Sequence, residues 1–204
     1  MLDGWARQRI DPALNKTARA LVRIGATPNA ITIASCLIGL AAAAAIAAGD
    51  LYVGLFLLLV SRLGDGLDGA VTKITGSTDF GGFLDIVLDF VFYGAIPLGF
   101  VLLDPAANAI AGAVLIFSFY VNGASFLAYA VMAEKRGETT DARGAKSLFF
   151  TTGLAEATET ILFFVAFCLL PAWFPVLAYV FAALTFYTAL SRIVLAASAF
   201  RNKT

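Results

Sequence analysis

Residues 61–90 read SRLGDGLDGAVTKITGSTDFGGFLDIVLDF and place four aspartates in a chain that is otherwise almost entirely apolar. Asp65 and Asp68 are three residues apart, and Asp85 and Asp89 are four apart. On a helix, either spacing puts both side chains on one face. A carboxylate inside hydrocarbon is costly, so four of them need compensating charge. The remaining sequence offers too few cations at the right place, and the stretch therefore indicates bound metal.

The composition is that of an integral membrane protein. The chain has 204 residues, of which 60% are hydrophobic and 14% charged, and its mean hydropathy is +0.87. A soluble domain is about 45–50% apolar. The absence of histidine excludes histidine-ligated zinc, Ser-His-Asp triads and histidine bases. Cys36 and Cys168 lie inside apolar segments, so we interpret them as packing residues.

The first 29 residues are polar and basic and predict an amphipathic helix on the cytoplasmic membrane surface. Asp11 followed by Pro12 is typical of an N-cap and a first helical position. The apolar face contains Leu14, Ala18, Leu21 and Val22, and the basic face contains Lys16, Arg19 and Arg23. The alternative is a soluble N-terminal helix.

Six apolar stretches follow, each near the ~20 residues that span a bilayer. They cover residues 30–48, 51–74, 82–103, 106–133, 148–170 and 176–200. The turns at 49–50, 104–105 and 171–175 contain no Lys or Arg, whereas the termini and the other two connections carry nearly all of these residues. The positive-inside rule therefore places both termini in the cytoplasm. We predict an all-α membrane protein over residues 1–204, with residues 1–29 as a juxtamembrane segment and residues 30–200 as a six-helix bundle.

The two aspartate pairs are expected to meet at the cytoplasmic ends of the second and third spans, because a short connection makes these helices antiparallel neighbours. Hard oxygen ligands without His or Cys favour Mg²⁺, Mn²⁺ or Ca²⁺. Two divalent ions bridged by carboxylates would cancel the repulsion and could clamp a pyrophosphate. Glycines interleave with the aspartates and would let a ligand approach the backbone, or would serve helix packing. These glycines are Gly64, Gly66, Gly69, Gly81 and Gly82.

The stretch resembles the signature of the CDP-alcohol phosphotransferase family, D-x-x-D-G-x-x-A-R, about eight residues, then G-x-x-x-D-x-x-x-D. All four aspartates match, as do Gly69 and Gly81. The predicted six-helix topology, the amphipathic helix and the Thr27-Pro28-Asn29 entry to the first span also resemble the family, so the resemblance covers the chain. Thr72-Lys73 replaces Ala-Arg, and the connection to Gly81 is one residue shorter than the commonest form. Lys73 keeps the positive charge but loses the planar fork of arginine.

The resemblance implies a role for each matching residue. Asp65, Asp68 and Asp85 would hold two Mg²⁺ or Mn²⁺ ions with help from Asp89, which would also be the general base. The nucleotide would lie against Pro28, Asn29, Gly69, Lys73 and Gly81. The reaction would transfer a phosphatidyl group from CDP-diacylglycerol to a small hydroxylated acceptor, with release of CMP.

The acceptor pocket is less well defined by the sequence. Arg62, Asn122, Arg143, Lys146 and Glu156 are the candidates for acceptor binding. The alternatives are ordinary positive-inside charge for the loop cations, contacts between helices for a polar stripe at Ser118, Asn122, Ser125 and Tyr129, and an ion pair of Glu156 or Glu159 with Arg192.

The expected protein is thus a phospholipid-synthesising enzyme of the bacterial inner membrane with a cytoplasmic active site. The resemblance also implies a homodimer, and no nucleic acid is expected as a partner. Three alternatives remain open: transfer of a phospho-alcohol from a CDP-alcohol to diacylglycerol, a family member without activity, and a small cation transporter with the aspartates as its ion pathway. A transporter predicts an inverted repeat, and the later half contains no second aspartate cluster.

Overall fold

The computed structural model describes residues 3–136 and 157–200, and the regular structure within them is entirely helical. This confirms the predicted all-α class. The elements are α1 (Asp3–Arg23), α2 (Pro28–Ala47), α3 (Leu51–Thr75), α4 (Asp79–Leu103), α5 (Pro105–Lys135), α7 (Ala157–Leu169), the short 3₁₀ helix η2 (Pro171–Trp173) and α8 (Phe174–Phe200).

Four helices in the described ranges are long and apolar enough to cross a membrane, namely α2, α4, α5 and η2–α8. The helix α3 has 25 residues, but it carries four charges from its middle onward, on Arg62, Asp65, Asp68 and Lys73. The described part of α7 has 13 residues, and the predicted span 148–170 begins outside the described residues. The described helices therefore support a membrane protein with four candidate spans.

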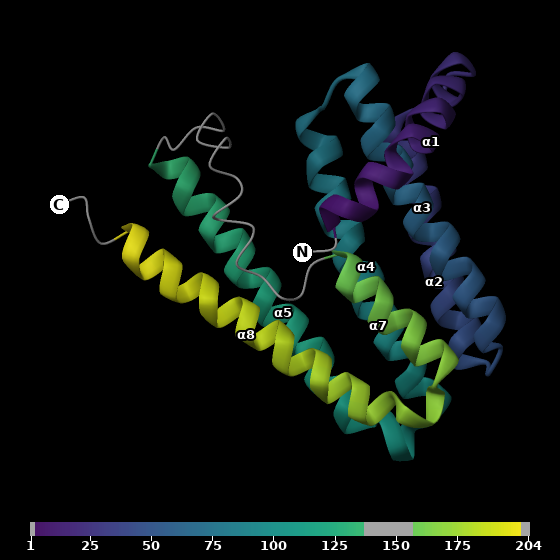
Figure 1. Ribbon diagram of the computed structural model, residues 1–204, viewed down its shortest axis with the longest axis vertical. Helices are drawn as coiled ribbons and strands as arrows, with labels where there is room; N and C mark the ends of the chain where they lie inside the picture. The colour runs from purple at the N-terminus through teal and green to yellow at the C-terminus, as the bar shows by residue number, and fades with distance from the viewer. Residues whose placement is uncertain (1–2, 137–156, 201–204) are drawn as a thin grey trace.

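The elements run between two ends of the bundle. Three connections, α2–α3, α4–α5 and α7–α8, lie at one end, which is the lower end in Figure 1. The helix α1 and the α3–α4 connection lie at the opposite end. The connections at the lower end contain no Lys or Arg, as the sequence predicts for one side of a membrane.

The helix α2 packs between α3 and α4 through small residues. A Cβ atom added at Gly99 of α4 would lie 2.7 Å from the backbone oxygen of Ala43. A Cβ added at Gly54 of α3 would lie 2.6 Å from Cγ1 of Ile46 and 3.2 Å from the oxygen of Ala42. Small residues let helix backbones approach closely where lipid supplies no hydrophobic driving force. The positions of α3 and α4 are therefore set by direct backbone contact with α2.

The other half of the core is aromatic and joins α4 to α7 and α8. The rings of Phe100 and Phe174 stack with centroids 4.8 Å apart, and those of Phe163 and Phe181 stack at 4.3 Å. Offset or edge-to-face aromatic pairs add attraction beyond their buried area. Cys36 and Cys168 are free and buried, which confirms that they are packing residues.

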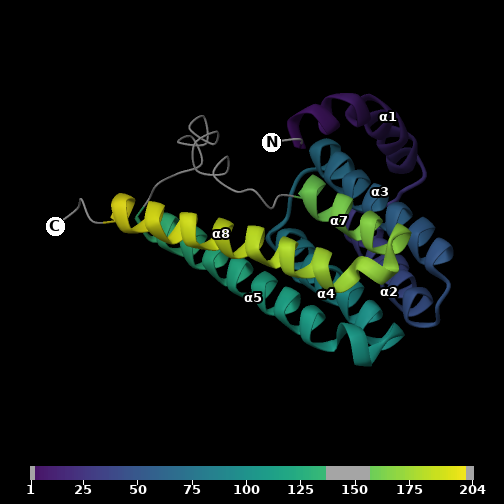
Figure 2. The same ribbon diagram turned by 60° about the horizontal axis from the view of Figure 1, so that its bottom comes forward.

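The helices α5 and α8 form an antiparallel pair that leans away from α2–α4 (Figures 1 and 2). Polar contacts hold this pair together. Arg192 of α8 donates to the backbone oxygen of Asn122 at 3.0 Å, to its Oδ1 at 2.9 Å and to Ser125 Oγ at 2.6 Å. Arg136 of α5 donates to the last carbonyls of α8, on Ala199 and Phe200. An intramembrane arginine is thereby satisfied within the pair.

The helix α1 packs across α3 (Figure 2). Its buried Ala18 clusters with Ala70 and Val71, whereas Lys16 and Arg19 are exposed, in agreement with the predicted amphipathic pattern. The predicted start at Asp11–Pro12 was wrong, because the helix begins at Asp3 and contains Pro12. A proline ends a helix only if the lost hydrogen bond and ring contact cannot be accommodated, and α1 continues on both sides of it.

Two glycines of α4 provide a matched test of the α2–α4 contact. Gly99→Ala should lower the free energy of unfolding by about 1–3 kcal/mol, because its Cβ would meet backbone rather than a movable side chain. Gly94 has no atom within 4 Å of its added Cβ, so Gly94→Ala should be neutral or mildly stabilising. Denaturation of both purified variants in detergent measures the difference. Equal stability would show that α2 and α4 can separate without cost.

Candidate functional site

Three of the four aspartates converge where α3 ends and α4 begins. Asp65, Asp68 and Asp85 each place one carboxylate oxygen within 4.8 Å of the other two. The packing of α3 and α4 on either side of α2 thus brings together residues that lie up to 20 positions apart in the chain. Three carboxylates this close repel one another unless a cation lies between them.

The donor set of this cluster fits a divalent cation. The side chain of Asp68 is buried, with 6% of its surface exposed, and its Oδ2 has no hydrogen-bond partner among the described residues. A buried carboxylate oxygen without a partner is costly, and a hard metal ion would satisfy it. Oxygen ligands favour Mg²⁺, Mn²⁺ or Ca²⁺ over softer metals. The three aspartates can therefore hold one of these ions.

The fourth aspartate, Asp89, lies outside this cluster and pairs with Arg62. Nη1 of Arg62 donates to Asp89 Oδ1 at 2.9 Å and lies 3.5 Å from Asp65 Oδ1. The guanidinium carbon lies 3.6 Å from the centroid of the Phe92 ring. The sequence predicts too few cations near the aspartates to balance their charge and makes Arg62 a candidate for acceptor binding. The structure instead pairs Arg62 with Asp89.

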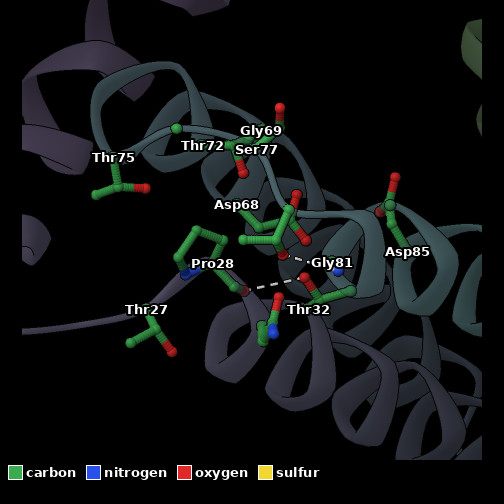
Figure 3. A pocket seen from close by; sticks show the side chains of 14 residues that line it. Thr27, Pro28, Thr32, Asp68, Gly69, Thr72, Thr75, Ser77, Gly81 and Asp85 are labelled. Atoms are coloured by element: carbon green, nitrogen blue, oxygen red, sulfur yellow. Dashed lines mark hydrogen bonds between the residues drawn. The ribbon is translucent and has the colours of Figure 1, made fainter.

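A pocket of about 440 Å³ adjoins the aspartate cluster. Figure 3 shows Asp68 near its centre, Pro28 and Thr32 of α2 beside it, and Asp85 of α4 at its edge. Its walls come from the start of α2, the end of α3, the α3–α4 connection and the start of α4. The lining residues are Thr27, Pro28, Asn29, Thr32, Asp68, Gly69, Thr72, Thr75, Gly76, Ser77, Thr78, Gly81, Gly82 and Asp85.

Two helix N-termini meet at this pocket, and each is capped by a threonine. The N–H of Ala30 donates to Thr27 Oγ1 at 3.3 Å, as the Thr27-Pro28 pattern predicts, and the N–H of Gly81 donates to Thr78 Oγ1 at 3.0 Å. Helix N-termini present N–H groups and the positive end of the helix dipole. The pocket therefore combines a carboxylate wall for cations with two helix ends that favour anions.

Four of the five glycines named in the aspartate stretch divide into two groups, while a Cβ at the fifth, Gly81, would lie 2.9 Å from Thr78 Oγ1 and 3.0 Å from Asn29 Oδ1. A Cβ added at Gly69 or Gly82 would meet nothing within 4 Å, so both glycines leave the pocket open. A Cβ at Gly64 would collide with Ser35 of α2, and one at Gly66 would lie 3.1 Å from Leu14 of α1. Gly64 and Gly66 therefore serve helix packing, the alternative that the sequence left open.

Four of the five residues predicted to bind the nucleotide line the pocket, and one does not. Pro28, Asn29, Gly69 and Gly81 line the pocket, whereas Lys73 is exposed and does not line it. Sequence reasoning missed the hydroxyl groups of the pocket wall, which come from Thr32, Thr75, Ser77 and Thr78. The Thr78-Asp79 pair is a helix-start signal that could have identified one of them.

The predicted acceptor residues are scattered. Arg62 is engaged by Asp89, and Asn122 accepts a hydrogen bond from Arg192. Arg143, Lys146 and Glu156 lie outside the described residues. The described residues thus bring no acceptor pocket together from this set.

Comparison with known proteins agrees with the sequence resemblance. The family model "CDP-alcohol phosphatidyltransferase" matches residues 25–199. The inner membrane protein YnjF of Escherichia coli is 44% identical over 193 residues, which cover 95% of this chain and 94% of that protein. An archaetidylinositol phosphate synthase of Pyrococcus horikoshii is 33% identical over 97 residues, covering 47% of this chain and 52% of that protein.

Solved structures share the fold. The phosphatidylinositol phosphate synthase PgsA1 of Mycobacterium tuberculosis with CDP-DAG bound superposes with a TM-score of 0.70 at 23% identity, covering 89% of this chain and 92% of that chain. The same protein in complex with manganese and citrate gives a TM-score of 0.71, covering 89% and 87%. With its aspartate signature, its all-helical fold and a family match over residues 25–199, the chain belongs to the CDP-alcohol phosphatidyltransferase family of phospholipid-synthesising transferases.

Proposed function

We propose that this protein transfers a phosphatidyl group from CDP-diacylglycerol to a small hydroxylated acceptor and releases CMP. The observation that carries the proposal is the pocket of about 440 Å³ whose wall includes Asp68 and Asp85 of the aspartate cluster. A nucleotide diphosphate needs a cavity, anion-binding groups and a counter-ion in one place. The capped starts of α2 and α4 and the aspartate cluster supply these three features.

The donor nucleotide is proposed to lie against Pro28, Asn29, Gly69 and Gly81, with Lys73 near the pocket mouth. The two open glycines leave room for a ligand beside the backbone of α3 and α4. A related protein of the same fold binds CDP-DAG, which supports this choice of donor over a CDP-linked alcohol.

A divalent ion, Mg²⁺ or Mn²⁺, is proposed to be held by Asp65, Asp68 and Asp85. When bound, such an ion would neutralise the charge that develops on the leaving CMP. The related synthase in complex with manganese supports a metal of this class. The protein's own part is to fix three carboxylates within 4.8 Å of one another at the pocket wall.

Asp89 is proposed as the general base. An alcohol is a poor nucleophile and needs a base within hydrogen-bond reach. The Asp89 carboxylate takes the hydroxyl proton while the alcohol oxygen forms a bond to the phosphorus that carries diacylglycerol. The bond from this phosphorus to the bridging oxygen breaks, and CMP leaves with the electron pair. The proton then passes from Asp89 to water.

The acceptor is proposed to reach Asp89 from the side away from the nucleotide pocket, since Asp89 is 32% exposed and does not line that pocket. Two proteins similar to this chain, an archaetidylinositol phosphate synthase and a phosphatidylinositol phosphate synthase, make phosphorylated inositol lipids, so inositol phosphate leads the candidate acceptors. Arg143, Lys146 and Glu156 remain the proposed binding groups for it.

We also propose that α3 and α7 cross the membrane together with the four candidate spans, which gives six crossing helices with both termini and the site in the cytoplasm. The connections without Lys or Arg lie at the end opposite α1 (Figure 1), as the positive-inside rule requires. The name of the E. coli relative supports the inner membrane as the location. A homodimer is proposed from family membership.

The activity is tested by CMP release from the purified protein in detergent. CDP-diacylglycerol and Mn²⁺ are supplied with one acceptor at a time: glycerol, glycerol 3-phosphate, inositol, inositol phosphate, serine, ethanolamine or choline. We expect acceptor-dependent CMP with one of them. Asp89→Asn should lower kcat by at least about 100-fold, because general-base catalysis contributes this much, while CDP-lipid binding persists. Full activity in Asp89→Asn would refute the assignment of the base.

The metal site has its own test, independent of turnover. Titration with Mn²⁺, followed by electron paramagnetic resonance, should show saturable binding by the wild type. Asp68→Asn should abolish it, because the buried Oδ2 is replaced by a group that cannot ligate as an anion. Asp79→Asn is the matched control, since Asp79 is an exposed carboxylate at the same end of the bundle. Equal loss in both variants would argue against a specific cluster.

The nucleotide pocket is tested at Gly69. Gly69→Leu places a side chain in open space that lines the pocket, and should raise the KM for CDP-diacylglycerol about tenfold, which corresponds to ~1.4 kcal/mol. Gly94→Leu adds the same side chain to α4 at an open position away from the pocket, and should leave KM unchanged. An unchanged KM in Gly69→Leu would place the nucleotide elsewhere.

A further inference from the structure

Arg62 lies between two of the four aspartates and touches both. Its Nη1 donates to Asp89 Oδ1 at 2.9 Å and lies 3.5 Å from Asp65 Oδ1. The two carboxylates belong to different helices, α3 and α4. A single guanidinium group thus links the metal-binding cluster, through Asp65, to the proposed base.

The Arg62 guanidinium group is enclosed and held through both of its terminal nitrogens, while its buried Nε has no hydrogen-bond partner among the described residues. Only 7% of its side chain is exposed, and its guanidinium carbon lies over the buried ring of Phe92 at 3.6 Å. Its Nη2 donates to Ser61 Oγ at 3.3 Å, and Ser61 in turn donates to the backbone oxygen of Ser35 at 2.7 Å. Contacts from α2, α3 and α4 therefore hold the group. A side chain so enclosed offers little surface to an acceptor molecule, which argues against the predicted acceptor role of Arg62.

The charges at the site can be counted. Four carboxylates carry four negative charges and Arg62 carries one positive charge, since a guanidinium group stays protonated. One divalent ion among Asp65, Asp68 and Asp85 leaves a single negative charge over the five side chains. A second divalent ion would need Asp89 as a ligand, and Arg62 already occupies Oδ1 of that carboxylate. The second ion would also meet a positive charge at short range.

We infer that Arg62 is the second cation of this site: a positioning residue that holds Asp89 apart from the metal-binding cluster, so that one divalent ion binds instead of two. This inference rests on the proposed function, because it assigns the partner of the proposed base. Asp89 is fixed through Oδ1, and its Oδ2 accepts no hydrogen bond from the described residues. That oxygen is the one that receives the proton of the acceptor hydroxyl.

The consequence is that removal of Arg62 frees Asp89 to become a metal ligand. The carboxylate then has no cation partner, and the nearest compensation is a divalent ion shared with Asp65 or Asp85. Arg62→Gln should therefore bind more metal and catalyse less. If Arg62 had only a structural role, its replacement would lower both metal binding and kcat, or would change neither.

The experiment counts Mn²⁺ ions per chain by electron paramagnetic resonance at saturation, on full-length protein in detergent. The wild type and the control Arg19→Gln, which removes an equal charge from the exposed face of α1, should bind one ion. Arg62→Gln should bind two, and Asp68→Asn none. In the CMP assay Arg62→Gln should lose about 100-fold in kcat, the cost of a misplaced catalytic group, with the KM for CDP-diacylglycerol within about threefold of wild type.

Arg62→Lys is the second variant and serves if Arg62→Gln fails to fold. It keeps the charge, so it should bind one ion, but its single ammonium group cannot reach Asp89 and Ser61 together. Its kcat should lie between those of the wild type and Arg62→Gln. A second ion bound by Arg62→Lys, or a kcat equal to that of the wild type, overturns the inference.

The failures of the two proposals can be told apart. Two ions in both the wild type and Arg62→Gln overturn the role of Arg62 and leave the proposed transferase function standing. A kcat of Arg62→Gln equal to that of the wild type also overturns the proposed role of Arg62. No ion in the wild type overturns the metal site of the proposed function, and the inference with it.

Discussion

The requirement to neutralise four carboxylates between apolar helices governs this structure. Three of them meet within 4.8 Å, with Asp68 buried and Asp65 half-buried, so their mutual repulsion and the burial of Asp68 call for a cation. Arg62 supplies one positive charge at the site, and the cluster of Asp65, Asp68 and Asp85 fits a divalent ion that would supply two more. The pocket, the bare glycines and the capped helix starts all lie around that arrangement. Function and stability therefore depend on the same charges, which is the usual reason that intramembrane carboxylates mark a functional site.

Close contact between backbones makes the arrangement rigid. Gly54 and Gly99 bring α3 and α4 against α2 at the end away from the site. Nearer the site, Gly64 lies against Ser35 of α2, and Ser61 Oγ donates to the backbone oxygen of Ser35 at 2.7 Å, so the C-terminal half of α3 is also held close to α2. Thr27 and Thr78 then fix the starts of α2 and α4 at the pocket. The cation site and the anion-favouring helix ends are thus preorganised by helix packing rather than by loops, so the protein does not need to assemble them when its substrate binds.

Much of this could be predicted from the sequence, because the decisive signals are local. Helix periodicity predicted the all-α class, and the two aspartate pairs predicted a convergent cluster, of which the structure brings together Asp65, Asp68 and Asp85 while Asp89 lies outside it. The partner of Arg62 could not be predicted, since residues 62 and 89 meet only through the way that α3 and α4 both pack on α2. Likewise, Gly66 and Gly69 look alike in sequence, and only the crossing of α1 makes one a packing residue and leaves the other facing the pocket. The start of α1 was predicted at Asp11–Pro12 because the backbone conformation of proline suits the first turn of a helix. The residues around Pro12 give no signal that the helix begins at Asp3.

The pocket draws its walls from residues 27–85 alone, and this has an evolutionary consequence. The proposed donor site thus comes from one contiguous segment, while α5 and α8 satisfy the half-buried Arg192 between themselves. The described residues of α5 and α8 do not line that pocket, although they contact α4 through α5 and through the stacked rings of Phe100 and Phe174. Substitutions on the faces of α5 and α8 that point away from α4 can therefore accumulate without dismantling the pocket. A chain divided in this way can retain its donor chemistry while the alcohol that it modifies diverges among descendants.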